Sequence, residues 1–413
     1  MGVLAEDMEP KHGDTKFKTS TAPLHDDTQW QTQLDNALPF PREYGLDWLR
    51  VFAFAVLIFY HTGMIFVTWD FHIKNADQST VMQWFMLLAN RWRLPLLFII
   101  SGAAVCFSLR RRGYLQFARE RFVRLFIPLV FGMLVVVPPQ IYFERLQQQA
   151  TTASYLEWYP SVFQFVPYPE GGALSWHHLW FVLYIFVYSL AGIPFFAWIR
   201  SANGQRIVAR MVGWFERWPA SFYLINVPNL IVAFTLGPHW PTTHNLVSDW
   251  ANLTGAFLTF LWGFTIASNQ RFLDLITERR REFLIATISV ATLFFTIYGT
   301  RPLGALPPFL RSVIWELVSS YFGMTAIMMF VGYARHYFRS GGPKLRYANN
   351  VVYPFYIVHQ TVMIAVGYYV IQMPWNLWFK FLIVAVATFL GSWGCVELVR
   401  RTPITRLLFG MKA

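Results

Sequence analysis

Charged side chains are scarce in this sequence. Asp, Glu, Lys and Arg make up only 14% of its 413 residues, against roughly a quarter in an ordinary soluble protein. Apolar residues reach 55% and aromatic residues 19%. A soluble core cannot absorb that much apolar surface, whereas a lipid bilayer can. There are also only two cysteines, Cys106 and Cys395. Both fall in apolar runs, where a thiol behaves as a small apolar group, and we expect no disulfide.

Long apolar runs recur along the chain. A membrane-spanning helix needs about 20 largely apolar residues. A window of that length finds ten such runs, at residues 46–67, 91–109, 123–143, 178–199, 221–238, 251–269, 283–300, 311–333, 350–372 and 378–399. The sequence therefore predicts an all-α polytopic membrane protein, a bundle of about ten transmembrane helices.

The basic residues orient this predicted bundle. If the N-terminus is inside, 26 of the 34 Lys and Arg residues fall in the N-terminal tail, in every second loop or in the C-terminal segment. That distribution follows the positive-inside rule, so we expect both termini to be cytoplasmic. We expect residues 1–45 to form a polar cytoplasmic tail and residues 46–413 a single transmembrane domain. The net charge of +12 is dispersed over these loops, which argues against nucleic acid as a partner.

Ionisable groups inside spanning segments are costly and therefore mark functional sites. The first predicted helix carries Asp47, Arg50 and His61. Eleven helical steps fall about 20° from three full turns, so Arg50 and His61 share a face and lie about 16 Å apart along the axis. They are suited to hold the two ends of an elongated ligand. The alternative is an arginine that snorkels to the interface and a histidine that only bonds a neighbouring helix.

A second basic group opens the third predicted helix. Arg121 and Arg124 are one turn apart there, after the run 110–112 of three arginines. Their guanidinium groups can converge, and arginine forks fit phosphate oxygens in two-point contacts. Anchoring to lipid head groups is the competing explanation for most of these residues.

Further polar residues lie within or beside the other apolar runs. Glu316 has a depth similar to that of His61, and a carboxylate that orients an imidazole is a recurring base-activating pair. His178 and His359 suit either a ligand or a packing hydrogen bond between helices. Metal ligation is not predicted, because the sequence has no His-x₃-His pair with a carboxylate and no close cysteine pair.

Several segments, in order, resemble the membrane-bound acyltransferase-3 family. Arg50, ten further residues and His61 resemble its Arg-x₁₀-His signature, and Arg121-Phe-Val-Arg124 resembles its Arg-x-x-Arg motif. Further similar segments are Pro95-Leu-Leu-Phe-Ile-Ile-Ser101-Gly102, His178-Leu-Trp180-Phe181, Tyr356-Ile-Val-His359-Gln360 and Glu397-Leu-Val-Arg-Arg401. The resemblance covers roughly residues 42 to 412. Trp69-Asp-Phe-His72-Ile-Lys-Asn75 resembles the branch that contains the periplasmic-glucan succinyltransferase.

The resemblance implies an acyl-CoA-dependent O-acyltransferase of the bacterial cytoplasmic (inner) membrane. Its donor would be acetyl-CoA or succinyl-CoA, with no permanently bound cofactor, and its acceptor a hydroxyl of an extracytoplasmic sugar or glucan. The expected roles are His61 as general base, Glu316 as its orienting partner, Arg50 beside the pantetheine arm, Arg121 and Arg124 on the CoA phosphates, His178, His359 and Trp180 on the substrate, and Arg93 on a dicarboxylic acyl tail.

Two questions stay open from the sequence. Transfer can occur in one step or through an acyl-enzyme on His61 or on a serine such as Ser101. A transporter or flippase for a glycan or an acyl-bearing metabolite would also place Arg, His and Glu inside a helix bundle, although the internal repeats common in transporters are not found in the sequence.

Overall fold

Helices account for nearly all regular structure in the computed structural model, which describes residues 42–411. Over these residues it contains no named strand, and two residues alone, Pro167 and Leu174, form an isolated β-bridge. Residues 1–41 of the predicted tail, which comprises residues 1–45, lie outside the described residues. The cytoplasmic placement of the tail therefore stays a prediction.

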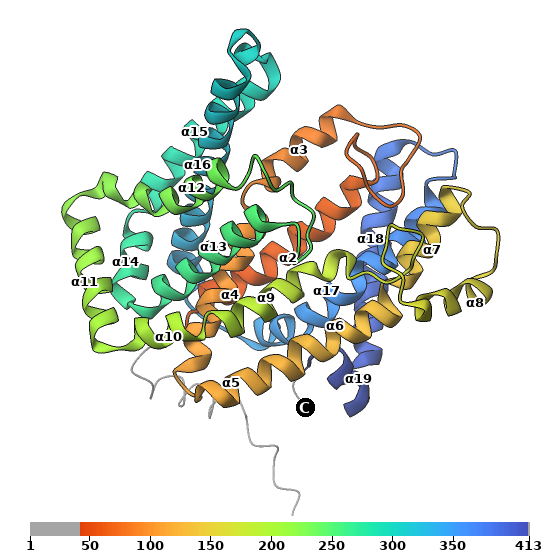
Figure 1. Ribbon diagram of the computed structural model, residues 1–413, viewed down its shortest axis with the longest axis horizontal. Helices are drawn as coiled ribbons and strands as arrows, with labels where there is room; N and C mark the ends of the chain where they lie inside the picture. Colours follow the sequence, from red (N-terminus) through yellow and green to blue (C-terminus); the bar gives the residue numbers. More distant parts are fainter. Residues whose placement is uncertain (1–41, 412–413) are drawn as a thin grey trace, which may run out of the picture. The chain divides into compact units, whose positions relative to one another are not determined.

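Most helices follow one another with short connections, whereas the longer segments 65–79 and 236–249 join α2 to α3 and α12 to α13 (Figure 1). Their bounds are α2 Tyr44–Met64, α3 Thr80–Asn90, α4 Arg93–Leu109, α5 Tyr114–Arg121, α6 Ile127–Phe131, α7 Pro138–Gln147, α8 Tyr155–Trp158, α9 Trp180–Ala191, α10 Ile193–Arg200, α11 Ala202–Arg217, α12 Val227–Thr235, α13 Trp250–Ser268, α14 Gln270–Glu278, α15 Arg280–Thr300, α16 Pro308–Tyr337, α17 Pro343–Val370, α18 Leu377–Val399 and α19 Pro403–Leu408.

The prediction of an all-α polytopic membrane protein is confirmed, with a slightly smaller number of full spans. Among the described residues, eight helices are long and apolar enough to cross a membrane. A ninth span is the pair His177–Ala191 and Ile193–Arg200, which is bent by 53°. The remaining predicted run, 221–238, corresponds to the shorter apolar helix Pro219–Thr235. Each predicted run thus has a helical counterpart.

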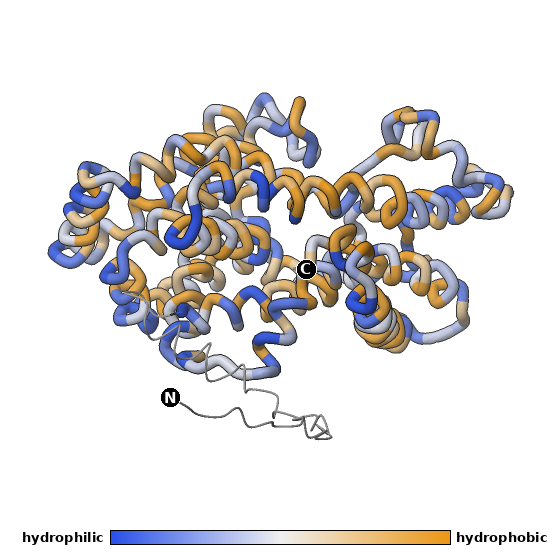
Figure 2. The backbone as a smooth tube through the Cα atoms, turned by 90° about the horizontal axis from the view of Figure 1, so that it is seen from below, coloured by the Kyte–Doolittle hydropathy of each residue, from blue (hydrophilic) through white to orange (hydrophobic). Residues whose placement is uncertain are grey.

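Large apolar side chains cover the outside of the bundle as well as its interior. Ile285 on α15 is 66% exposed, and Leu382 and Phe389 on α18 are both 55% exposed. Figure 2 shows hydrophobic stretches along the helices, with hydrophilic stretches at many of their ends and in the connecting segments. An apolar exterior of this kind is stable in lipid, where it needs no water-facing polar cover.

Small residues allow the central helices to approach closely. Helices α4 and α13 cross where Gly102 faces the Phe260 carbonyl and Gly263 faces the Ile99 carbonyl. A Cβ atom at Gly102 would lie 1.9 Å from the Phe260 oxygen, and one at Gly263 would lie 2.1 Å from the Ile99 oxygen. Glycine at such crossings is the usual solution in membrane bundles, because backbone-to-backbone packing replaces the missing hydrophobic driving force.

Prolines reshape the third span, Tyr114–Gln147. It contains two π-helical turns, η1 Phe122–Phe126 and η2 Gly132–Val136, which end two residues before Pro128 and Pro138. A proline ring clashes with the carbonyl four residues earlier and removes one N–H. The wider turn relieves that clash, because the Ile127 N–H donates to the Phe122 carbonyl five residues earlier in the chain. Such π turns are frequent at functional sites, and η1 carries Arg124.

Candidate active site

Three histidines from distant segments meet inside the bundle. His61 comes from α2, His359 from α17, and His178 from η4, a short 3₁₀ turn (His177–Leu179) before α9. His61 Nδ1 lies 3.0 Å from His359 Nε2, and their rings stack with centroids 5.2 Å apart. The His178 ring stands edge-on to His359, with centroids 5.3 Å apart. The structure therefore brings together three of the residues that the sequence analysis singled out.

Backbone carbonyls of α17 hold two of these rings. His359, which is 1% exposed, places Nδ1 2.6 Å from the Tyr356 carbonyl. His178 places Nε2 3.0 Å from the Ile357 carbonyl, and the Tyr356 hydroxyl donates to the His178 carbonyl in return. Because a buried polar group is costly without a partner, these bonds determine how α17 and the turn before α9 face one another.

The contacts also determine which nitrogen of each ring carries a proton. A carbonyl oxygen only accepts, so His359 Nδ1 must donate to Tyr356, and the neutral His359 ring then has an accepting Nε2. His61 Nδ1 must therefore donate to His359 Nε2. The neutral His61 ring is left with a lone pair on Nε2, which is the atom that can take a proton from a substrate.

Neutral amides complete the surroundings of the histidines. Gln140, which is fully buried, places Nε2 3.4 Å from His178 Nδ1 and 2.8 Å from the Thr361 hydroxyl. Its carbonyl oxygen accepts from Gln360 Nε2 at 3.1 Å. A polar network is stable at this depth only when its members are satisfied. Hydrogen bonds between uncharged groups occupy both nitrogens of His178 and of His359, and Nδ1 of His61.

Glu316 is not the partner of His61 in the described structure. The nitrogen that a carboxylate was expected to orient, His61 Nδ1, bonds His359 instead. Glu316 on α16 lines an open cleft of about 1240 Å³ together with Arg91, Trp180 and His244. Trp180, predicted to contact substrate, stacks on His244 there with centroids 4.1 Å apart. The predicted Glu316–His61 pairing is therefore not formed, although whether Glu316 acts on a substrate stays a prediction.

Arg93 lies next to the histidine cluster. Its guanidinium stands 3.3 Å above the ring of Tyr60, the residue before His61. It also donates to the carbonyl and the side-chain oxygen of Asn90, at 3.3 and 3.2 Å. Arg93 is 6% exposed, and its Nε has no hydrogen-bond partner among the described residues. A buried cation with an unused donor can donate a hydrogen bond to a further oxygen.

Four arginines gather at the other end of α2. Arg121 is within electrostatic reach of Arg50, Arg112 and Arg124. Glu120 forms ion pairs with Arg112 at 3.0 Å and with Arg124 at 3.3 Å, and Arg50 pairs with Asp47 at 3.7 Å. The arginines outnumber these carboxylates, so the group is positively charged overall.

Within this group the two predicted phosphate ligands have different surroundings. Arg124 Nε donates to the Gly410 carbonyl at 3.2 Å, which ties the chain after α19 to η1. The Arg121 guanidinium lies 4.8 Å from the Phe117 ring, and its Nε has no partner among the described residues. Arg121 is thus the residue of the pair with more unused donors.

Gln140, Gln360 and Tyr356 were not predicted to be site residues. Gln140 and Gln360 lie within predicted spans, but only ionisable residues had been treated as costly there. Tyr356 had been quoted as part of a motif without a role. An uncharged polar side chain in an apolar run was the available signal for Gln140 and Gln360, since an amide also needs partners in lipid.

Comparison with known proteins shows the family of the chain. The family model described as an acyltransferase domain matches residues 43–397. Curated proteins named glucans biosynthesis protein C, from Salmonella paratyphi B and Salmonella heidelberg among others, are 25% identical to the chain over 168 residues. That alignment covers 40% of this chain and 42% of each relative, so the chain spans about two fifths of their length. No solved structure matches it.

Proposed function

Because the chain belongs to this acyltransferase family and is a multi-pass membrane acyltransferase, we propose that it moves an acyl group from acyl-CoA to a sugar or glucan hydroxyl. The donor would enter from the cytoplasm and the acceptor from the opposite face of the bacterial inner membrane. The observation that carries the proposal is the lone pair that the Tyr356–His359–His61 chain of hydrogen bonds leaves on His61 Nε2.

The proposed reaction needs one base and good positioning. His61 Nε2 takes the proton of the acceptor hydroxyl while its oxygen attacks the thioester carbonyl. The C–S bond then breaks, and the departing thiolate receives that proton from His61. The protonated ring is stabilised by its Nδ1–H bond to His359, which becomes a charge-assisted bond.

The arginine group is proposed to bind the CoA phosphates. Arg50 and His61 lie eleven residues apart on α2, about 16 Å along the helix axis. Phosphates bound by Arg121 and Arg124 would therefore lie toward one end of α2 and the thioester toward the other, with the pantetheine arm passing Arg50. The two-point geometry of guanidinium with phosphate favours this assignment. It makes acyl-CoA a substrate of the site rather than a resident cofactor.

The acyl group and the acceptor are finer proposals. The relatives are named for glucan biosynthesis, which supports a glucan acceptor that His178, His359 and Trp180 help to position. Arg93 would bind a dicarboxylic acyl tail, because it is a buried cation beside Tyr60 and His61. If Arg93→Gln reduces succinyl and acetyl transfer equally, Arg93 does not select the acyl group.

The test is acyl transfer by the purified protein with acetyl-CoA and succinyl-CoA. His61→Ala should abolish release of free CoA while binding of CoA persists. His239→Ala, at an exposed histidine outside the site, is the matched control and should behave as wild type. A folded preparation that neither binds CoA nor turns it over with glucan acceptors would favour a transporter or flippase.

A further inference from the structure

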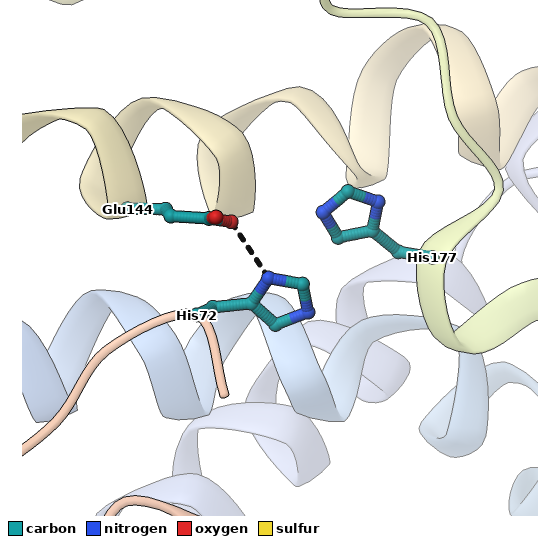
Figure 3. Close-up of side chains that lie close together, drawn as sticks. All are labelled: His72, Glu144 and His177. Atoms are coloured by element: carbon teal, nitrogen blue, oxygen red, sulfur yellow. Dashed lines mark hydrogen bonds and ion pairs between the residues drawn. The ribbon is translucent and has the colours of Figure 1, made fainter. Parts of the chain in front are cut away.

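A second cluster of ligand-type side chains lies outside the proposed catalytic histidines. It contains His72 from the connection between α2 and α3, Glu144 from α7 and His177 from η4 (Figure 3). One donor atom from each residue lies within 4.8 Å of the other two. His72 and His177 stack with ring centroids 4.4 Å apart and planes 10° from parallel. Three separate segments thus converge on one point.

The present hydrogen bonds leave this cluster incomplete. His72 Nδ1 lies 2.7 Å from Glu144 Oε2. His177 Nδ1 is engaged with the Ser175 hydroxyl at 2.7 Å, whereas its Nε2 is buried and has no partner among the described residues. In Figure 3 the His177 ring faces the His72–Glu144 pair. A buried nitrogen without a partner is costly and calls for an explanation.

The outer oxygen of the carboxylate is held in place by other residues. Glu144 Oε1 accepts from the Tyr168 hydroxyl at 2.7 Å and from Gln148 Nε2 at 3.3 Å. Those two bonds turn Oε2 toward the histidines. Metal-binding carboxylates commonly have such supporting hydrogen bonds, which fix the ligand before the ion arrives.

We propose that His72, Glu144 and His177 bind a divalent transition-metal ion, of which Zn²⁺ is the best match. Two imidazoles and one carboxylate are a recognised zinc donor set, with a fourth position for water. Zinc–ligand distances of about 2.0–2.2 Å place tetrahedral donors about 3.4 Å apart. The observed 4.8 Å limit therefore requires only a small inward movement of the side chains. The ion would supply the partner that His177 Nε2 lacks.

The bound ion would join the α2–α3 connection to α7 and to the start of α9. Phe71 lies between this cluster and the catalytic histidines, with ring centroids 5.0 Å from His72 and 6.5 Å from His61. An ion that holds His72 would also hold Phe71 against His61. No metal-ligand spacing in the sequence signals this site, because its ligands are 72 and 33 positions apart.

The experiment uses full-length protein with a histidine-free affinity tag, stripped with a chelator. Zn²⁺ binding is measured by competition with a chromophoric chelator, and Co²⁺ binding by its visible absorption. Wild type and the exposed-site control His239→Ala should bind one equivalent. His177→Phe, which keeps a stacking ring, and Glu144→Gln, which keeps the shape, should lose stoichiometric binding. Tyr168→Phe, which removes only the supporting bond, should weaken binding roughly 10–100-fold.

The thermal unfolding temperature gives an independent readout. Addition of Zn²⁺ should raise it for wild type and for His239→Ala, because a ligand that binds only the folded state stabilises it. Addition of Zn²⁺ should leave the unfolding temperature of His177→Phe unchanged. Equal binding by wild type and His177→Phe, or no binding of either ion by folded wild-type protein, would overturn the proposal. Neither result depends on acyl transfer.

Discussion

The hydrogen bond between His61 and His359 gives the sharpest test of the proposed chemistry. Replacing His359 by Phe keeps an aromatic ring against His61 but removes the Nε2 atom that accepts from His61 Nδ1 at 3.0 Å. The Nδ1–H then has no acceptor there. A buried donor left without a partner costs about 1–3 kcal/mol. If that cost falls on the transition state, it corresponds to a rate loss of about 5- to 150-fold.

The matched variant is His359→Gln. The side-chain amide of Gln reaches about as far as Nε2 of a histidine, so its carbonyl oxygen can accept the same proton. We expect kcat for acyl transfer to fall by about 5- to 150-fold in His359→Phe and clearly less in His359→Gln. CoA binding should stay unchanged in both, because the arginine group lies at the other end of α2.

The assay follows release of free CoA and acylated acceptor by purified protein, with thermal unfolding as a check on folding. In a His61→Ala background, His359→Phe should have little further effect, since two residues that act as one unit are not additive. Wild-type kcat in His359→Phe, or equal loss in His359→Phe and His359→Gln, would refute the tautomer argument and remove His359 from the catalytic machinery.

Two other predictions concern donor binding and helix packing. Arg124→Ala should weaken CoA binding by about 1.5–3 kcal/mol, or about 10- to 150-fold in Kd. Arg119→Ala, at an exposed arginine, should leave CoA binding unchanged. Titration with CoA measures both variants, and equal affinities would place the phosphates elsewhere. Gly102→Ala should destabilise the fold by about 1–3 kcal/mol, because its Cβ would meet the Phe260 carbonyl oxygen at 1.9 Å. A Cβ atom at Gly213 would have no atom within 4 Å, so Gly213→Ala should instead stabilise the fold by about 0.4–1 kcal/mol. Thermal unfolding in detergent compares the two variants, and similar unfolding temperatures would contradict the close packing at Gly102.

The positions of the spanning segments could be predicted because apolarity is a local property. The shapes of the spanning segments could not be predicted from apolarity. The sequence window treated residues 178–199 as one helix, whereas the chain bends by 53° between Ala191 and Ile193. Gly192 and Pro194 flank that bend, and a proline there lacks the N–H that would continue the ladder. A hydropathy average is insensitive to this effect, as it is to the π turn before Pro128.

The candidate site, too, could be predicted only in part: its residues could be singled out, but their pairing could not. His61 and His359 could be singled out because an imidazole in an apolar run is costly and therefore functional by default. Their pairing could not be predicted, since the two residues lie 298 positions apart and only the packing of α2 against α17 brings them together. The convergence of His72, Glu144 and His177 was not predicted, for a further reason. Each lies near or beyond the end of a predicted span, where a polar side chain has little desolvation cost and therefore does not indicate a function.

The failed pairing of Glu316 with His61 has a physical explanation in the cost of charge. A carboxylate would place a second buried charge beside His61, in addition to that of Arg93, and moving a charge out of water has a high desolvation cost. The neutral His359 ring accepts the same Nδ1–H at a much lower desolvation cost. Its own proton is held by the Tyr356 carbonyl, so the orientation of both rings derives from the backbone of α17. The proposed base is thus oriented without a carboxylate beside it, which suits the proposed thioester donor because a thioester needs only moderate activation.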